Sequence, residues 1–193
     1  MIAENRNRLY VSVAVKPYCY RWLVNNFHID GAREDCISLR RHRLLQVIFR
    51  NMLQHKTRLQ LHDTQSPARW RTRTVNIALG SHDLEHHGLD LSPEGKAEFA
   101  GLVEQLCQED FRQFFVHTYM VEPRVKMIIE QYHRLRGFSE EDWPQESMQK
   151  IVTRMGVTAQ LRRERESFLQ KSNALFTANL SAIMDSKTAI SAI

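Results

Sequence analysis

The chain has 193 residues, of which 42% are hydrophobic and 25% charged, proportions typical of a globular protein of ordinary size. Its 7 glycines, 5 prolines and mean hydropathy of -0.45 argue against collagen-like, linker-like and membrane-spanning chains. Residues 1–8 are mostly polar and lack the apolar segment of a secretory signal, so we expect a cytoplasmic protein with no membrane partner. The 3 cysteines form no C-x-x-C pair, which favours buried thiols.

Charge is distributed in blocks along the chain. Residues 1–75 hold 14 Lys and Arg against 5 Asp and Glu, residues 76–146 hold 6 against 14, and residues 147–193 hold 7 against 3, for a total of +5. A basic block attracts polyanions such as nucleic acid, because neutralising phosphates releases counterions. The blocks could equally pair with each other, inside one fold or across a dimer, and charge alone leaves both interpretations open.

The N-terminal part predicts a strand followed by a helix. Apolar residues alternate from Leu9 to Val15, which is the period of a half-buried strand over residues 8–16. Pro17 ends the strand and suits the first turn of a helix of about ten residues, before Asp30 and Gly31 turn the chain.

A second helix and two extended segments follow. Ser38 is placed to cap a helix whose apolar residues repeat every three or four positions as far as Leu53. Residues 60–63 and 72–79 carry the patterns of extended chain, and these two segments could pair as a hairpin.

From Ser92 onward the sequence predicts helices alone. Ser92 is the N-cap of a helix that keeps its apolar spacing as far as Tyr119. Pro123 starts another helix, which stops at Gly137, and a third stops at Gly156. The fold class is therefore α+β and predominantly α-helical, with a bundle-like helical region. Its expected divisions are a basic strand and helix region over 1–80, an acidic helical region over 81–156 and an amphipathic helical arm over 157–193.

The C-terminal arm has apolar side chains at every seventh position. The positions between the two apolar series, Ser172, Asn179 and Ser186, are polar, which weakens a dedicated coiled coil. A stripe of this kind needs a partner, and a terminal arm that reaches a second copy is a simple route to a homodimer. The residues expected to make this contact are Phe168, Leu169, Leu175, Phe176 and Ile183.

The strand, helix and helix of residues 8–54 resemble the ribbon-helix-helix family of DNA-binding proteins. In that family the strands of two subunits pair as a ribbon in the major groove, and outward strand side chains read bases. The resemblance implies that role for Tyr10, Ser12 and Ala14, flanked by Arg8 and Lys16.

The chain is also similar to uncharacterised proteins of bacterial phages and mobile elements. Val-Lys-Pro-Tyr at residues 15–18 and Gly-Phe-Ser-Glu-Glu-Asp at residues 137–142 carry this second resemblance. It implies an accessory or regulatory role on DNA and assigns no functional residues.

A third basic feature is the alternation of Arg69, Arg71 and Arg73 with Trp70 and Thr72. In a strand these three guanidiniums share one face about 7 Å apart, near the spacing of phosphates. We therefore expect a nucleic-acid-binding protein, with DNA favoured, that acts mainly through phosphate contacts. The alternative is a protein-interaction or assembly subunit whose charge blocks dock on each other. The predicted nucleic-acid-binding residues are Arg8, Lys16, Arg40, Arg41, Arg43, Arg69, Arg71 and Arg73.

The helices on either side of Gly137 have the outline of a helix-turn-helix. The second helix would present Gln149, Lys150, Thr153 and Arg154 to a duplex. Four carboxylates lie near its start: Glu140, Glu141, Asp142 and Glu146. They would repel phosphates, so a plain α-hairpin is favoured.

Histidines supply the one enzymatic hypothesis. His82 and His86 are four residues apart, and Asp83 or Glu85 is near enough for a third metal ligand. The H-E-x-x-H order is missing, so a polar surface turn is favoured. Because the glycines match no phosphate-binding motif and no nucleophile elbow occurs, we assign no catalytic residue, no metal and no cofactor.

Overall fold

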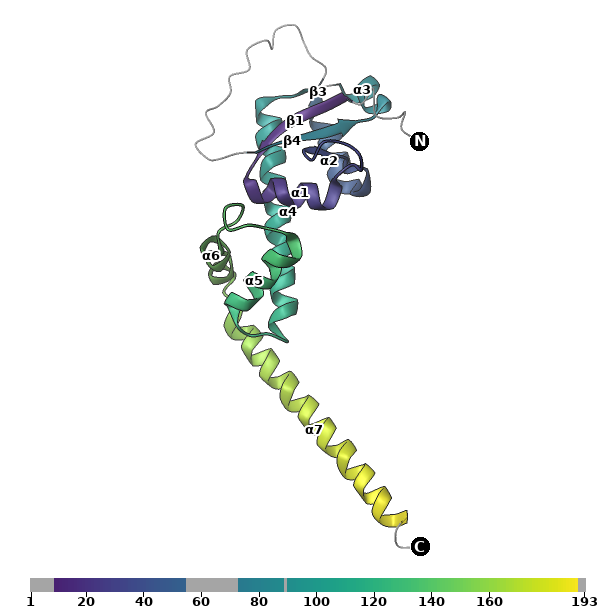
Figure 1. Ribbon diagram of the computed structural model, residues 1–193, viewed down its shortest axis with the longest axis vertical. Coiled ribbons are helices and arrows are strands. Elements are labelled where there is room, and N and C mark those ends of the chain that lie inside the picture. The colour runs from purple at the N-terminus through teal and green to yellow at the C-terminus, as the bar shows by residue number, and fades with distance from the viewer. Residues whose placement is uncertain (1–8, 55–72, 89, 191–193) are drawn as a thin grey trace.

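The computed structural model describes residues 9–54, 73–88 and 90–190, which form a body and one long helix that leads away from it (Figure 1). Helices dominate and the sheets are small, so the predicted α-rich α+β class is confirmed. The elements in chain order are β1 (Leu9–Val15), α1 (Pro17–Phe27), β2 (Cys36–Ile37), the 3-10 helix η1 (Leu39–Arg41), α2 (Arg43–Met52), β3 (Leu53–Gln54), β4 (Arg73–Leu79), α3 (Ser81–His87), β5 (Asp90–Leu91), α4 (Pro93–Tyr119), α5 (Val125–Arg136), α6 (Gln145–Met155) and α7 (Thr158–Ile190).

The larger sheet has the strand order β1-β4-β2. β1 and β4 are antiparallel, with Leu9 opposite Leu79 and Val15 opposite Arg73, whereas β2 is parallel to β4. Along β1, Val11 and Val13 are buried and Ser12 is exposed, which confirms the strand predicted from the alternation of apolar residues.

The start of the second helix differs from the prediction. Ser38 is in extended backbone, its amide donates to the carbonyl of Phe27, and its side chain caps nothing. η1 intervenes, so the N-cap of α2 is His42, whose Nδ1 accepts a hydrogen bond from the amide of Leu45 at 3.1 Å. The predicted extended segment 72–79 corresponds to β4, which pairs with β1. Residues 60–63, its proposed hairpin partner, lie outside the described residues.

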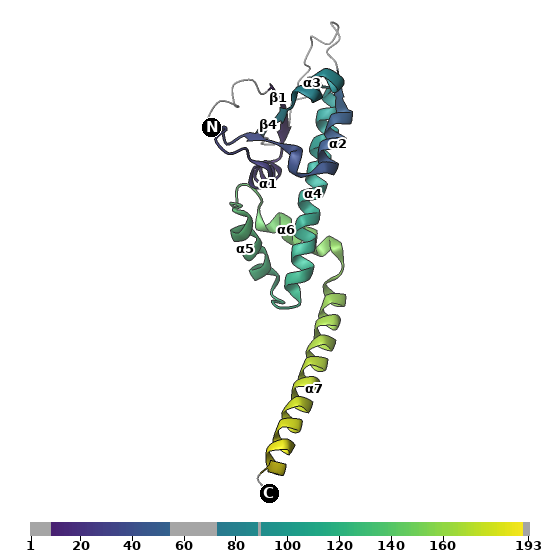
Figure 2. The ribbon, with the colours of Figure 1, turned by 90° about the vertical axis from the view of Figure 1, so that its right-hand side faces the viewer.

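The other elements of the body lie along the long helix α4 (Figures 1 and 2). Ser92 caps it as predicted, because its Oγ accepts a hydrogen bond from the amide of Gly95 at 3.0 Å. Figures 1 and 2 place the sheet, α1 and α2 beside the first half of α4, and α5 and α6 beside its second half. The predicted stops of α5 and α6 are confirmed, since Gly137 and Gly156 adopt left-handed backbone with φ of 62° and 65°.

One buried apolar cluster runs from Val11 in the sheet to Leu161 in the first turns of α7. Nε of Arg165 on α7 still donates to the carbonyl of Met120 at 3.1 Å, and the rest of the helix leads away from the body in both views (Figures 1 and 2). Among the helices of the described residues, none combines the length and apolarity needed to cross a membrane.

Candidate functional site

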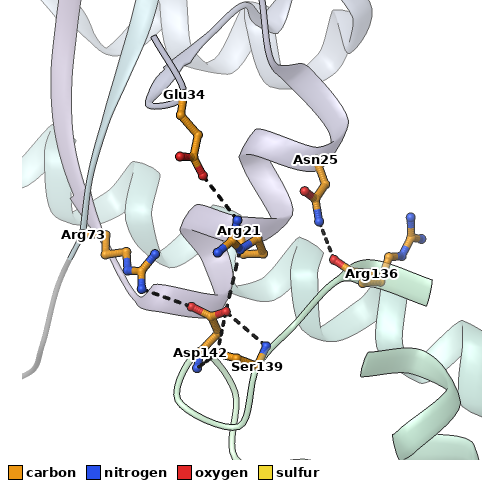
Figure 3. A network of polar contacts seen from close by, with 7 residues as sticks. All are labelled: Arg21, Asn25, Glu34, Arg73, Arg136, Ser139 and Asp142. Carbon is orange, nitrogen blue, oxygen red and sulfur yellow. Dashed lines mark hydrogen bonds and ion pairs between the residues drawn. The ribbon is translucent and has the colours of Figure 1, made fainter. Parts of the chain in front are cut away.

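The basic N-terminal region meets the acidic helices at the loop between α5 and α6, where Asp142 is buried (Figure 3). Its Oδ2 lies 3.7 Å from Nε of Arg21 on α1, and its Oδ1 lies 3.6 Å from Nη2 of Arg73 on β4. Ser139 donates to the same carboxylate from its amide at 3.1 Å and from its hydroxyl at 2.9 Å. A single carboxylate therefore joins the loop to the first helix and the central strand.

Asp110 on α4 forms a second junction. Its carboxylate accepts hydrogen bonds from Nε1 of Trp22 at 3.3 Å and from the hydroxyl of Tyr132 at 2.8 Å. Nη2 of Arg136 is 2.6 Å from the other oxygen, and the carbonyl of Arg136 accepts from the side chain of Asn25 (Figure 3). Asp110 thus holds α1, α4 and α5 together.

Two further cations of the basic region are paired with carboxylates of the acidic region. Nζ of Lys16 is 2.6 Å from Glu104 on α4, which also accepts from the hydroxyl of Tyr18 at 2.9 Å. Nε of Arg50 is 2.5 Å from Asp83, the carboxylate that also accepts from the amide of Gly80. The opposite charge blocks therefore meet each other inside one chain.

Burial also raises the pKa of a hydroxyl group and a thiol group in this region. Loss of contact with water, followed by the negative charge of Asp110, raises the pKa of Tyr132 well above its usual value. Burial likewise raises the pKa of the Cys107 thiol, which lies beside Cys19. Cys107 is consequently a neutral thiol at physiological pH and lacks the thiolate that a nucleophile requires.

Among the residues that it describes, the structure does not bring the predicted nucleic-acid-binding residues together on one surface. Lys16 and Arg73 are joined to Glu104 and Asp142, so their charges are partly compensated. Arg40, Arg41 and Arg43, on η1 and at the start of α2, are exposed, and none has an ion pair within the described parts of the chain. The other three predicted residues, Arg8, Arg69 and Arg71, lie outside the described residues.

The outward face of β1 carries the side chains that the ribbon-helix-helix resemblance assigns to base reading. Tyr10, Ser12 and Ala14 are exposed, while β1 itself is paired along its length with β4 of the same chain. The hydroxyl of Ser12 donates to Asn76 at 2.6 Å, and Asn76 donates to Asp35 at 2.6 Å. A polar row therefore crosses this face from β1 to the segment before β2.

The histidine segment is a short helix, α3, whereas a turn was favoured from the sequence. The rings of His82 and His86 are 4.4 Å apart, as the spacing of four residues predicts. The candidate third ligand Asp83 is engaged by Arg50 and the amide of Gly80. In the part of the chain that the structure describes, no group of three or more His, Cys, Asp or Glu is placed to hold a metal ion.

The helices on either side of Gly137 are present, and a loop joins them. Glu140 accepts from the amide of Gln145 at 2.9 Å and so stabilises the start of α6, while Asp142 lies buried against the sheet. The aromatic ring of Trp143 stacks on Tyr18 of α1, with centroids 4.4 Å apart and planes inclined by 15°. The four side chains of α6 considered for base contact are all exposed: Gln149, Lys150, Thr153 and Arg154.

α7 separates its apolar residues into two groups. Leu161 is 5% exposed and packs on the body, whereas Phe168, Leu175 and Phe176 are 57%, 67% and 66% exposed. Leu169 is 39% exposed, and Ile183 lies on α7 where only the backbone is described. Four of the five predicted contact residues are therefore accessible in the single chain.

Comparison of the chain with protein families, curated proteins and solved structures finds no match. The residues that join the body, Asp110 and Asp142 above all, were not singled out from the sequence as partners of specific arginines.

Proposed function

We propose that the protein is an assembly subunit that pairs with a second copy of itself through α7. The observation that carries this proposal is the exposure of Phe168, Leu175 and Phe176 on a 33-residue helix that leads away from the body. Large apolar side chains grouped on one helix face are a feature of association surfaces. The ion pairs inside the body support the same proposal, because Lys16 and Arg73, two residues predicted to bind nucleic acid, are paired with carboxylates of the chain itself.

A second copy is the partner that fits this face best. Apolar positions repeat every seven residues, so two α7 helices can interdigitate along a common seam. At 1.5 Å per residue the helix is about 50 Å long, which is long enough for several such layers. The polar seam positions Ser172 and Asn179 lower the stability of the pair, so we expect an association that is reversible on dilution.

Light scattering of the full chain tests this proposal directly. We expect a dimer for the natural sequence and a monomer for the double variant Phe168→Ser and Phe176→Ser. The matched control is Leu44→Ser with Val121→Ser, which removes two apolar side chains that are 63% and 83% exposed on the body. A monomeric natural chain, or a dimer that survives the α7 substitutions, would contradict the proposal.

A second candidate function is nucleic-acid binding through Arg40, Arg41 and Arg43. Its support is that these three exposed arginines are within four residues of one another, on η1 and at the first residue of α2, with no carboxylate partner in the described residues. Phosphate contacts of this kind predict a steep loss of affinity for a mixed-sequence duplex between about 50 and 200 mM salt.

Reversal of charge tests this second candidate. Replacing Arg40, Arg41 and Arg43 by Glu should abolish duplex binding. Reversing Arg134, Arg162 and Arg163, which are also exposed and unpaired in the described residues, should leave most of it. Equal losses in the two triple variants would show that binding has no defined site at residues 40–43.

A further inference from the structure

A cavity of about 510 Å³ lies where the start of α1 meets α6 and the loop before it. Its volume is within the range of small-molecule sites, roughly 300–1,000 Å³. Lys16, Pro17 and Tyr18 line it at the start of α1, Gln108 lines it from α4, and eight residues between Glu141 and Arg154 complete the lining. Neither α7 nor the arginines at residues 40–43 contribute to it, so it is separate from both proposed association surfaces.

Part of the lining of this cavity is apolar and aromatic. Tyr18 stacks on Trp143, which is 2% exposed and held in turn by Phe111 and Phe138 at centroid distances of 5.7 Å. Pro17, Pro144 and Ile151 complete the apolar lining. Because Trp143 is fixed from several sides and Tyr18 stacks on it, the Tyr18 ring is held in place before any ligand arrives, which lowers the entropic cost of binding.

The rim of the cavity carries an excess of positive charge. Lys150 and Arg154 are one turn apart on α6, both line the cavity and are exposed, and neither has an ion pair in the described residues. Lys16 adds a third cation, partly compensated by Glu104. Two carboxylates line the same cavity, but Asp142 is balanced by the two arginines at its junction, which leaves exposed Glu141 as the opposing charge.

We propose that this cavity binds a small molecule with a flat apolar body and one anionic group, a carboxylate or a phosphate. The apolar body lies along the lining formed by Tyr18 and Ile151, and the anionic group lies between Lys150 and Arg154. A guanidinium and an ammonium one helical turn apart can both donate charge-assisted hydrogen bonds to one anion. The apolar lining supplies the remaining affinity by removing the ligand body from water.

A pair of fluorescent probes with the same kind of ring system tests the proposal in the full chain. Anilinonaphthalene sulfonate has an anionic group, and phenylnaphthylamine has none. Replacing Lys150 and Arg154 by Gln should weaken the sulfonate probe by more than about tenfold, because the loss of either charge-assisted hydrogen bond alone accounts for about that factor, and should leave the neutral probe nearly unchanged. The matched control replaces Arg40 and Arg43 by Gln, two exposed arginines that do not line the cavity, and should change neither affinity.

A second variant blocks the cavity itself. Ser147 lines it without being buried, so Ser147→Trp should fill part of the space and weaken both probes while the circular dichroism spectrum stays that of the natural chain. Displacement of the sulfonate probe by naphthoate or by naphthyl phosphate then distinguishes a carboxylate ligand from a phosphate ligand. The proposal is wrong if the sulfonate probe binds the Gln variant and the Trp variant as tightly as it binds the natural chain.

Discussion

Aromatic side chains have opposite environments in the body and in α7. In the body, Phe111, Tyr132 and Trp143 are buried and pack against one another, with centroid distances between 5.1 and 6.3 Å. On α7, Phe168 and Phe176 are more than half exposed. These aromatic rings of the body therefore cover one another, whereas the two rings on α7 are left open to solvent in the single chain.

Charged side chains show the same contrast. In the body the buried Asp142 faces Arg21 and Arg73, while the cations of residues 40–43 face solvent. Residues of one chemical type thus divide into those that hold the fold together and those that remain available for partners. The substitutions below test that division.

The largest effect is expected from truncating the aromatic cluster. Trp143→Ala removes a ring that contacts α1, α4 and α5, and should lower the free energy of unfolding by about 3–5 kcal/mol. Phe168→Ala should lower it by less than about 0.5 kcal/mol in dilute solution, where α7 is unpaired. Urea unfolding of both variants at low protein concentration measures the difference, and similar losses would show that α7 packs against the body.

The next effect comes from removing the buried charge at the junction. Asp142→Asn keeps an acceptor for Ser139 but leaves Arg73 without a counter-charge and Arg21 with Glu34 alone, 3.3 Å away. The side chains of Arg21 and Arg73 are 29% and 45% exposed, so we expect a loss of about 2 kcal/mol, below the roughly 3–5 kcal/mol of a fully buried pair.

The neighbouring carboxylate is the control for that substitution. Glu141 is exposed and has no hydrogen bond or ion pair in the described residues, so Glu141→Gln should change the free energy of unfolding by less than about 0.5 kcal/mol. If the two variants unfold at the same urea concentration, Asp142 does not hold the loop to the sheet.

A smaller effect should appear at alkaline pH. Burial raises the pKa of Tyr132 in the folded protein, whereas the unfolded chain loses this proton near a pKa of 10. The folded state therefore keeps a proton that the unfolded state releases, and stability falls as the pH rises above about 10, by up to about 1.4 kcal/mol per unit. Tyr132→Phe should make the free energy of unfolding fall less steeply with pH between about pH 9 and 11. An unchanged slope would show that Tyr132 is not the source of this pH dependence.

The helices and strands could be predicted from the sequence because their signals are local. Alternating valines defined β1, Ser92 marked the start of α4, and Gly137 and Gly156 marked the ends of α5 and α6. The predicted N-cap of α2 was wrong. Ser38 and His42 both precede the helix, but the three-residue helix η1 lies between them, so His42 is the residue directly before α2 and caps it.

The pairing of charges could not be predicted in the same way. Asp142 was grouped with Glu140 and Glu141 at the start of α6, yet only Glu140 contacts that helix terminus and Asp142 turns toward the sheet. Arg73 has the same alternation as its neighbours in the sequence, but its partner comes from a distant loop. Such choices depend on tertiary packing, which local spacing does not encode.

The smallest effect is expected at the two exposed histidines of α3. Replacing both His82 and His86 by Ala gains helix propensity but loses the contact between the two rings, so the two contributions oppose each other. We expect the free energy of unfolding to change by less than about 0.5 kcal/mol. Zinc should not raise the melting temperature of the natural chain, because two imidazoles without a third ligand form a weak site and Asp83 is already paired with Arg50. A zinc-dependent rise in melting temperature that disappears in the double variant would instead show that these histidines bind the metal. In that case α3 would be a ligand-binding element of the body and not only a structural one.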